Sequence, residues 1–174
     1  MTHLKNILYS LYCNASFKFI YFYIYNLFFG RKVFKMYAPH KKNFENKINK
    51  LKSNKILIGM EMQVINYNIP YLYQVLSNEN FLDKEMNGLI IGCYEGHSTL
   101  FFINSCIRAK FTCVDLWNKE KLSKGYNGDA EAYFEKNLEN FNQRVSKIKS
   151  DSQSFLDNNS KKFDLIYLDG SHNQ

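Results

Sequence analysis

Residues 88–100 have the sequence Gly-Leu-Ile-Ile-Gly-Cys-Tyr-Glu-Gly-His-Ser-Thr-Leu, and this stretch decides the fold. The short apolar run 88–91 meets a glycine, which is typical of a buried strand that enters a tight turn. We expect a helix to follow over about 95–106. A buried strand that leads directly into a helix predicts a parallel sheet with covered faces.

The chain continues this alternation downstream of the first strand. Further short strands are expected at 111–114, 145–149 and 163–168. Between them we expect a helix with Asp129 as its N-cap and a short helical turn over 152–156. The apolar face of the Asp129-capped helix consists of Ala130, Tyr133, Phe134, Leu138 and Phe141. The fold class predicted is therefore α/β, with a Rossmann-like parallel sheet.

The N-terminal part has a different character. Residues 4–15 show helical spacing of apolar residues, and residues 17–29 are rich in Phe and Tyr and end at Gly30. Three interpretations of 17–29 stay open: a helix packed on the domain or on a partner, an interfacial membrane helix, or a membrane span. Residues 41–55, rich in Lys and Asn, are predicted to be an exposed linker. Pro70 is expected to open a helix.

Charge and composition separate the two parts further. Residues 1–86 hold 12 Lys/Arg against 5 Asp/Glu, whereas residues 87–174 hold 11 of each. The basic excess suggests anionic partners such as lipid head groups or nucleic acid, or else a solvated surface. We predict a basic, aromatic-rich helical extension over 1–55 and a Rossmann-like domain over 56–174. The four cysteines lack zinc spacing and the chain starts without a secretory signal, which predicts a cytoplasmic protein.

Three polar features follow predicted strands, where parallel sheets bind ligands. The first is the glycine turn 92–96, and the second is Asp115, placed to accept ribose hydroxyls. The third is 169–172, Asp-Gly-Ser-His, which combines a carboxylate with an imidazole suited to proton transfer. Each also has a structural alternative: a tight turn, a loop carboxylate, or a helix cap with a surface histidine.

These three segments together resemble class I S-adenosylmethionine-dependent methyltransferases. Residues 88–100 resemble motif I of the subgroup with the form IGCxEGxST, and residues 111–117 are similar to its second motif. Residues 163–172 resemble the FDxIYIDGSH segment. The resemblance covers about half of the chain.

The resemblance implies roles for individual residues. Residues near S-adenosylmethionine would be Gly92, Cys93, Tyr94, Glu95, Gly96, Ser98, Asp115, Leu116, Asp151, Ser152 and Asp169. Among them, Asp115 would bind the ribose, while Asp151 and Ser152 would lie near the adenine. Asp169 would hold a divalent cation such as Mg²⁺ in the manner of catechol-type O-methyltransferases. His172 would act as the base toward an acceptor hydroxyl.

Two departures from the family pattern stand out. Ile90 occupies a position where the family has a carboxylate that helps to hold the methionine amino group. The family sheet also has seven strands, and only four are predicted here. We therefore expect a truncated fold that is poorly soluble or inactive by itself, with an open edge at its fourth strand.

The predicted function is methyl transfer to an oxygen of a sugar or small molecule. One alternative is an incomplete relic whose basic aromatic N-terminus, residues 1–35, docks on a membrane or a partner. Another is a nicotinamide-dependent oxidoreductase, although Tyr94 stands where GxGxxG needs its second glycine. Nucleic-acid binding is not expected, because the aromatic cluster resembles a packed or interfacial helix rather than a stacking platform.

Overall fold

The computed structural model describes residues 17–59, 64–118 and 128–169, and these form an α/β fold. Within them, four parallel strands make one sheet in the order β3-β2-β1-β4. The strands are β1 (Asn87–Ile91), β2 (Lys110–Asp115), β3 (Val145–Lys149) and β4 (Leu165–Leu168). The Rossmann-like parallel sheet predicted from the sequence is confirmed.

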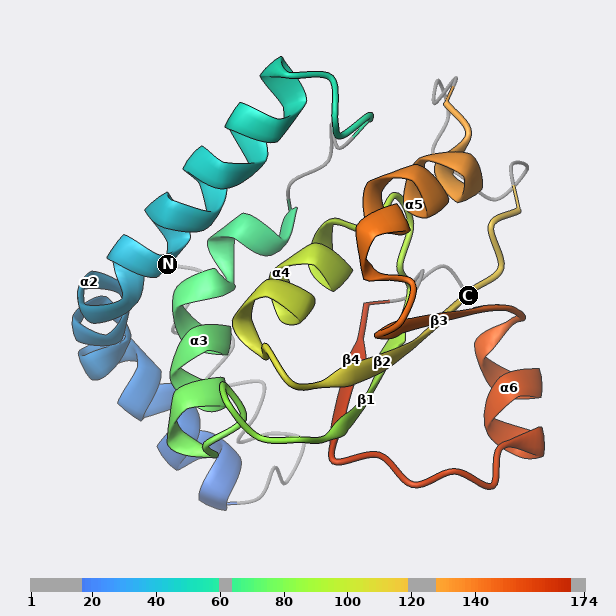
Figure 1. The fold of residues 1–174 in the computed structure, drawn as a ribbon. Coiled ribbons are helices and arrows are strands. Elements are labelled where there is room, and N and C mark those ends of the chain that lie inside the picture. Colours follow the sequence, from blue (N-terminus) through green and yellow to red (C-terminus); the bar gives the residue numbers. More distant parts are fainter. Residues whose placement is uncertain (1–16, 60–63, 119–127, 170–174) are drawn as a thin grey trace.

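The helices lie on both faces of this sheet (Figure 1). They are α2 (Phe17–Ser53), α3 (Ile69–Asn78), α4 (His97–Ser105), α5 (Ala130–Leu138) and α6 (Ser152–Asn158), with short 3-10 turns η1 (Val64–Tyr67) and η3 (Glu139–Phe141). One face packs into a large core that draws on α2 to α5. The opposite face holds a small cluster of Leu89, Ile91 and Val114, against which Phe155 of α6 packs.

The strand register follows from side-chain alternation in β1. Leu89 and Ile91 point to the α6 face, while Ile90 points to the large core, so the central strand is buried on both sides. In the register, Gly88 pairs with Phe111 of β2 and with Leu165 of β4. Parallel pairing brings the carboxyl ends of all four strands to one edge, as the crossover helices require.

Several local predictions are confirmed. Asp129 caps α5 by accepting a hydrogen bond from the Ala132 amide at 3.1 Å, and Pro70 lies in the first turn of α3. The strand predicted over 163–168 is shorter, because β4 begins only at Leu165. The amphipathic helix predicted over 4–15 lies outside the described residues.

Two predictions about the N-terminal part are wrong. The aromatic helix does not end at Gly30, and residues 41–55 are not an exposed linker, because α2 continues to Ser53. Phe44 and Ile48 recur at helical spacing among the lysines, and both are buried in the main core. Burial of this apolar stripe stabilises the helix despite its polar composition.

No helix within the described residues is long and apolar enough to cross a membrane. The division into an extension over 1–55 and a domain over 56–174 stays a prediction, although Phe44 and Ile48 join the core of the second part.

Candidate functional site

The turn after β1 has an unusual backbone. Gly92, Tyr94 and Gly96 all have positive φ, at 87°, 48° and 93°. Such values suit glycine, whereas at Tyr94 they cost free energy unless the surroundings hold the conformation. The Gly92 amide donates to the Val114 carbonyl at 2.9 Å, which continues the β1–β2 ladder into the turn.

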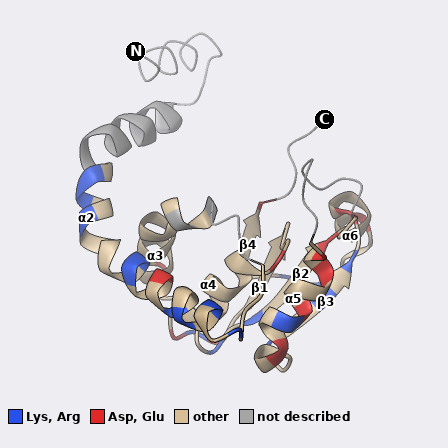
Figure 2. Ribbon diagram, turned by 90° about the horizontal axis from the view of Figure 1, so that it is seen from above, with Lys and Arg blue, Asp and Glu red and all other residues tan. Residues whose placement is uncertain are grey.

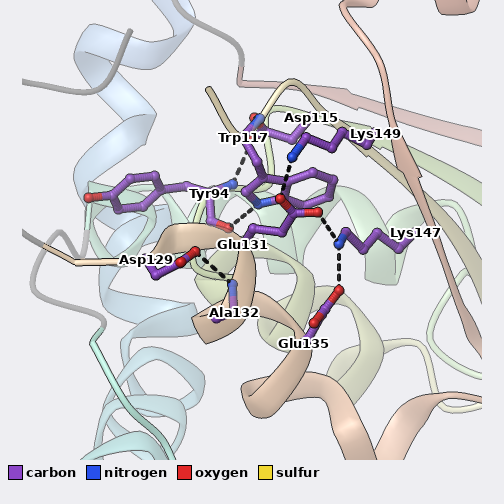
Figure 3. Close-up of polar contacts among 9 residues, drawn as sticks. All are labelled: Tyr94, Asp115, Trp117, Asp129, Glu131, Ala132, Glu135, Lys147 and Lys149. Carbon is purple, nitrogen blue, oxygen red and sulfur yellow. Dashed lines mark hydrogen bonds and ion pairs between the residues drawn. The ribbon is translucent and has the colours of Figure 1, made fainter. Parts of the chain in front are cut away.

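Asp115, the last residue of β2, holds this turn in place (Figure 3). Its Oδ2 accepts hydrogen bonds from the amides of Cys93 at 2.7 Å and Tyr94 at 2.8 Å, and its Oδ1 accepts one from the Trp117 amide at 2.9 Å. Hydrogen bonds to a carboxylate are stronger than neutral ones. A carboxylate accepts about four hydrogen bonds, so roughly one position on Oδ1 is left for a ligand hydroxyl.

Trp117, two residues after Asp115, also bonds to the turn after β1. Its indole Nε1 donates to the Tyr94 carbonyl at 2.9 Å, so both backbone polar groups of Tyr94 are bonded to residues that follow or end β2 (Figure 3). Its ring is 4% exposed and packs on Phe134 of α5, with centroids 5.0 Å apart. Trp117 ends the segment 111–117 that resembles the second family motif, but the sequence predicted no role for it. The signal that could have indicated one is an indole N–H two residues after Asp115.

Ion pairs join α5 to β3 beside Trp117 (Figure 3). Glu131 contacts Lys147 and also Lys149, the latter at 2.5 Å, and Glu135 contacts Lys147 at 2.5 Å. The Lys147 ammonium also lies 5.0 Å from the centre of the Trp117 ring. Hydrogen bonds from Lys147 and then Lys149 lower the pKa of Glu131. This network fixes α5 over the ends of β2 and β3.

Asn137 of α5 ties another segment to the turn. The Oδ1 atom of this buried side chain accepts a hydrogen bond from the Ile58 amide at 2.9 Å. Its Nδ2 atom donates to the Ile58 carbonyl at 3.0 Å and to the Glu95 carbonyl at 2.9 Å. Glu95 is itself 1% exposed and lies against Gly59, where an added Cβ would stand 2.5 Å from its Oε1. The sequence carried no signal for this contact, because Asn137 and Ile58 are far apart in the chain.

The end of β4 lies beside the end of β1. The Asp169 amide donates to the Ile91 carbonyl at 2.8 Å, and the Asp169 carboxylate is exposed and accepts from the Tyr167 hydroxyl at 3.3 Å. Burial raises the pKa of Tyr167, and the charge of Asp169 adds to this. His172, the predicted base, lies outside the described residues.

The end of β3 lies on the other side of β2. The Ser150 amide donates to the Asp115 carbonyl at 3.0 Å. Asp151 then caps α6 by accepting from the Ser154 amide at 2.8 Å, and this hydrogen bond lowers the pKa of Asp151. Asp151 and Ser152 are exposed. Their placement near an adenine stays a prediction.

Several predicted cofactor residues have side chains that face the protein interior. Cys93, Glu95 and Ser98 are 2%, 1% and 6% exposed, so any contact from them to a ligand would come from the backbone. Burial raises the pKa of the Cys93 thiol well above its usual range. An added Cβ at Gly96 would stand 3.3 Å from both Leu138 and Phe134, so this glycine allows α5 to approach α4. Leu116 is half-buried.

A metal site is not formed by the described part of the chain. Within 17–59, 64–118 and 128–169, no three His, Cys, Asp or Glu side chains come together to hold an ion. Asp169 supplies one exposed carboxylate at the end of β4.

Comparison with known structures gives distant matches. A Staphylococcus aureus protein assigned as a caffeoyl-CoA O-methyltransferase is 18% identical, with a TM-score of 0.46; the match covers 78% of this chain and 57% of that one. An O-methyltransferase from Bacillus cereus, solved with SAH, is 15% identical, with a TM-score of 0.43 and coverage of 74% and 54%. This chain thus spans little more than half of either protein, and these distant matches assign no function.

Comparison at the level of sequence families gives a direct assignment. No curated protein matches the chain. The family model described as a methyltransferase domain matches residues 89–174, which include the glycine turn, Asp115 and Asp169. The C-terminal half of the chain therefore belongs to the methyltransferase domain family.

Proposed function

We propose that this chain binds S-adenosylmethionine where β1 and β2 end and transfers its methyl group to an oxygen of a sugar or small molecule. The observation that carries the proposal is the Asp115 carboxylate, which bonds to the turn after β1 through the Cys93 and Tyr94 amides. These two hydrogen bonds hold the positive-φ turn at the carboxyl edge of the sheet, where parallel sheets bind ligands.

The strand order supports this location. The chain runs from β1 outward through β2 to β3 and then returns to place β4 on the other side of β1. The switch point therefore lies between β1 and β4, next to the glycine turn. Open α/β sheets bind nucleotide-like ligands in the crevice outside this point.

Asp115 would have two functions in the proposed complex. Three hydrogen bonds from backbone amides shape the turn, and the remaining acceptor position on Oδ1 would receive a ribose hydroxyl. This differs from a simple picture in which both carboxylate oxygens are free for the ribose. Since the hydrogen bonds from the turn already orient the carboxylate, ligand binding would cost little further ordering.

The chemistry would require an acceptor hydroxyl to lose its proton as it attacks. S-adenosylmethionine supplies an activated methyl group on sulfur when bound. Asp169 lies at the end of β4 beside β1, and in this proposal its exposed carboxylate would orient an acceptor or support His172 as base. Most of the rate gain in such a displacement comes from positioning the two reactants.

Titration calorimetry with S-adenosylhomocysteine, the product form of the cofactor, tests the proposal. We expect micromolar binding, weakened more than about tenfold, or ~1.4 kcal/mol, in Asp115→Ala. Asp115→Asn keeps one acceptor oxygen for the turn. Comparing its affinity with that of Asp115→Ala separates the loss of a ribose contact from collapse of the turn. Asp157→Ala removes an exposed carboxylate of α6 and should bind like the wild type.

The titration also decides between the competing interpretations. If folded protein fails to bind S-adenosylhomocysteine, the methyltransferase proposal is wrong for this chain. Tighter binding of NADH in the same experiment would instead support a nicotinamide-dependent oxidoreductase. Circular dichroism of each variant shows whether a loss of binding reflects a loss of folding.

A further inference from the structure

The basic character of this protein resides on one helix. Residues 17–53, which form α2, contain nine Lys/Arg and one Glu, for a net charge of +8. The rest of the chain holds 14 Lys/Arg and 15 Asp/Glu, for a net charge of −1. The overall charge of +7 is therefore a property of α2, which runs along the rim of the molecule away from the sheet (Figure 2).

Five of the nine cations of α2 lie on one exposed face, which we call the basic stripe. It consists of Arg31, Lys32, Lys35, Lys42 and Lys50, and all five are exposed. At about 100° per residue they fall within an arc of roughly 100°, and the stripe is about 29 Å long at 1.5 Å per residue. The buried residues Val33, Phe44 and Ile48 lie on the opposite face.

The stripe is not neutralised by its own helix. The acid of α2, Glu45, lies off the stripe and contacts Lys41 at 3.7 Å. Lys47 lies about 60° beyond the stripe and donates to the Asn104 side chain at 2.5 Å. In Figure 2 the Asp and Glu positions, drawn red on the ribbon, lie mainly around α5 and α6, on the far side of the molecule from α2.

We propose that the basic stripe of α2 docks on an anionic lipid surface. A bilayer that contains acidic lipids is a flat negative surface, and each Lys or Arg brought near it adds to the binding. A helix that presents one cationic face over several turns can lie parallel to that surface. This proposal does not depend on the methyltransferase activity.

Apolar and aromatic residues favour lipid over nucleic acid as the partner. Residues 17–29, the start of the same helix, include eight Phe or Tyr in thirteen positions, and aromatic residues prefer the membrane interface. At 100° per residue Met36 lies about 40° beyond the edge of the stripe, and it is 59% exposed. The phosphate backbone of a nucleic acid would attract the cations of the stripe, but it would gain no binding energy from these apolar and aromatic side chains.

Flotation of the full chain with lipid vesicles tests the proposal. Phosphatidylcholine vesicles with and without roughly one third phosphatidylserine are compared at low and high salt, since charge attraction is screened as salt rises. We expect binding only to the anionic vesicles at low salt. Reversing three cations of the stripe, in Arg31→Glu/Lys35→Glu/Lys42→Glu, should weaken that binding about 100-fold.

A matched variant separates the stripe from net charge. Lys110→Glu/Lys161→Glu/Lys162→Glu makes the same change of six charges at exposed positions outside α2, and should weaken binding less than about threefold. Both sets lie at exposed sites, and circular dichroism confirms that each variant folds. Equal weakening by the two sets would overturn the proposal, as would failure of the wild type to float with anionic vesicles. Stronger, stripe-dependent binding to a DNA duplex at the same salt would also overturn it.

Discussion

At the scale of single residues, the candidate site depends on a few side chains that bond to backbone groups. The Asp115 carboxylate accepts hydrogen bonds from three backbone amides, and the Trp117 indole donates one to the carbonyl of Tyr94. Tyr94 and Trp117 both have positive φ, a conformation that non-glycine residues adopt at a cost. The hydrogen bonds to Asp115 and Trp117 offset that cost.

We expect Trp117→Phe to destabilise the protein by about 1–3 kcal/mol, because the partly buried carbonyl of Tyr94 loses its donor while most ring packing against Phe134 is kept. Urea unfolding measures the change. Tyr71→Phe is the control, since its hydroxyl contact to the Gly30 carbonyl is long, at 3.4 Å, and should cost less than about 0.5 kcal/mol. Equal stabilities for Trp117→Phe and the wild type would show that the indole contact is not formed.

At the scale of elements, the β1–β2 pairing requires a glycine. Gly88 pairs with Phe111, and a Cβ added at Gly88 would stand 2.3 Å from the Phe111 ring. That ring is 1% exposed, so it has little room to move. Gly88, within the apolar run that predicts the strand, is thus a position where any added side chain would overfill the core.

We expect Gly88→Ala to lower the free energy of unfolding by about 1–3 kcal/mol through overpacking. Asn87→Ala, at the exposed neighbouring position of the same strand, should change it by less than about 0.5 kcal/mol. Chemical denaturation of both variants gives the comparison. Equal stabilities for the two variants would show that the Phe111 ring moves aside for a Cβ at Gly88.

The α5–β3 ion pairs predict a pH dependence. Because Lys147 and Lys149 lower the folded pKa of Glu131 below its ordinary value of 4.5, the contribution of Glu131 to stability is present above that value and is lost as pH falls through the folded pKa. Glu131→Gln should therefore be less stable than the wild type near neutral pH, with the difference shrinking in acid. Glu139→Gln, which removes an exposed pair to Lys136, should show a smaller effect. A constant difference at all pH values would contradict this origin.

At the scale of the whole molecule, α2 is part of the core as well as its basic rim. Ile48 is 2% exposed and joins the same cluster as Phe101 and Phe111. Ile48→Ala should destabilise the entire fold by about 2–5 kcal/mol, in one cooperative transition. Met36→Ala, at an exposed position of the same helix, should cost less than about 0.5 kcal/mol. Local loss of α2 while the sheet stays folded would instead support an independent extension.

Much of the sheet could be predicted because its signals are local. The apolar run at 88–91 and the strands at 111–114 and 145–149 are short and bounded by glycine or polar residues, and they lie close to their predicted positions. The first two are buried, whereas 145–149 is half-buried to exposed. Asp129 was predicted as a cap from its place before an amphipathic segment. The linker over 41–55 was predicted wrongly, because lysine and asparagine dominate the composition and hide Phe44 and Ile48.

The sequence by itself determined the alternation of strands and helices, the glycine turn and the acids that follow the strands, because each depends on residues close together in the chain. Only the tertiary structure decided that Asp115 bonds to the turn, that Asn137 holds Ile58 to Glu95, and that α2 turns its cations outward. The hydrogen bond between Tyr94 and Asp115 joins residues 21 positions apart in the chain, and the one between Ile58 and Asn137 joins residues 79 positions apart. The geometry of both follows from how the elements pack. Hydrogen bonding and burial over such separations have no local pattern in sequence, so they exist only once the sheet and its helices assemble.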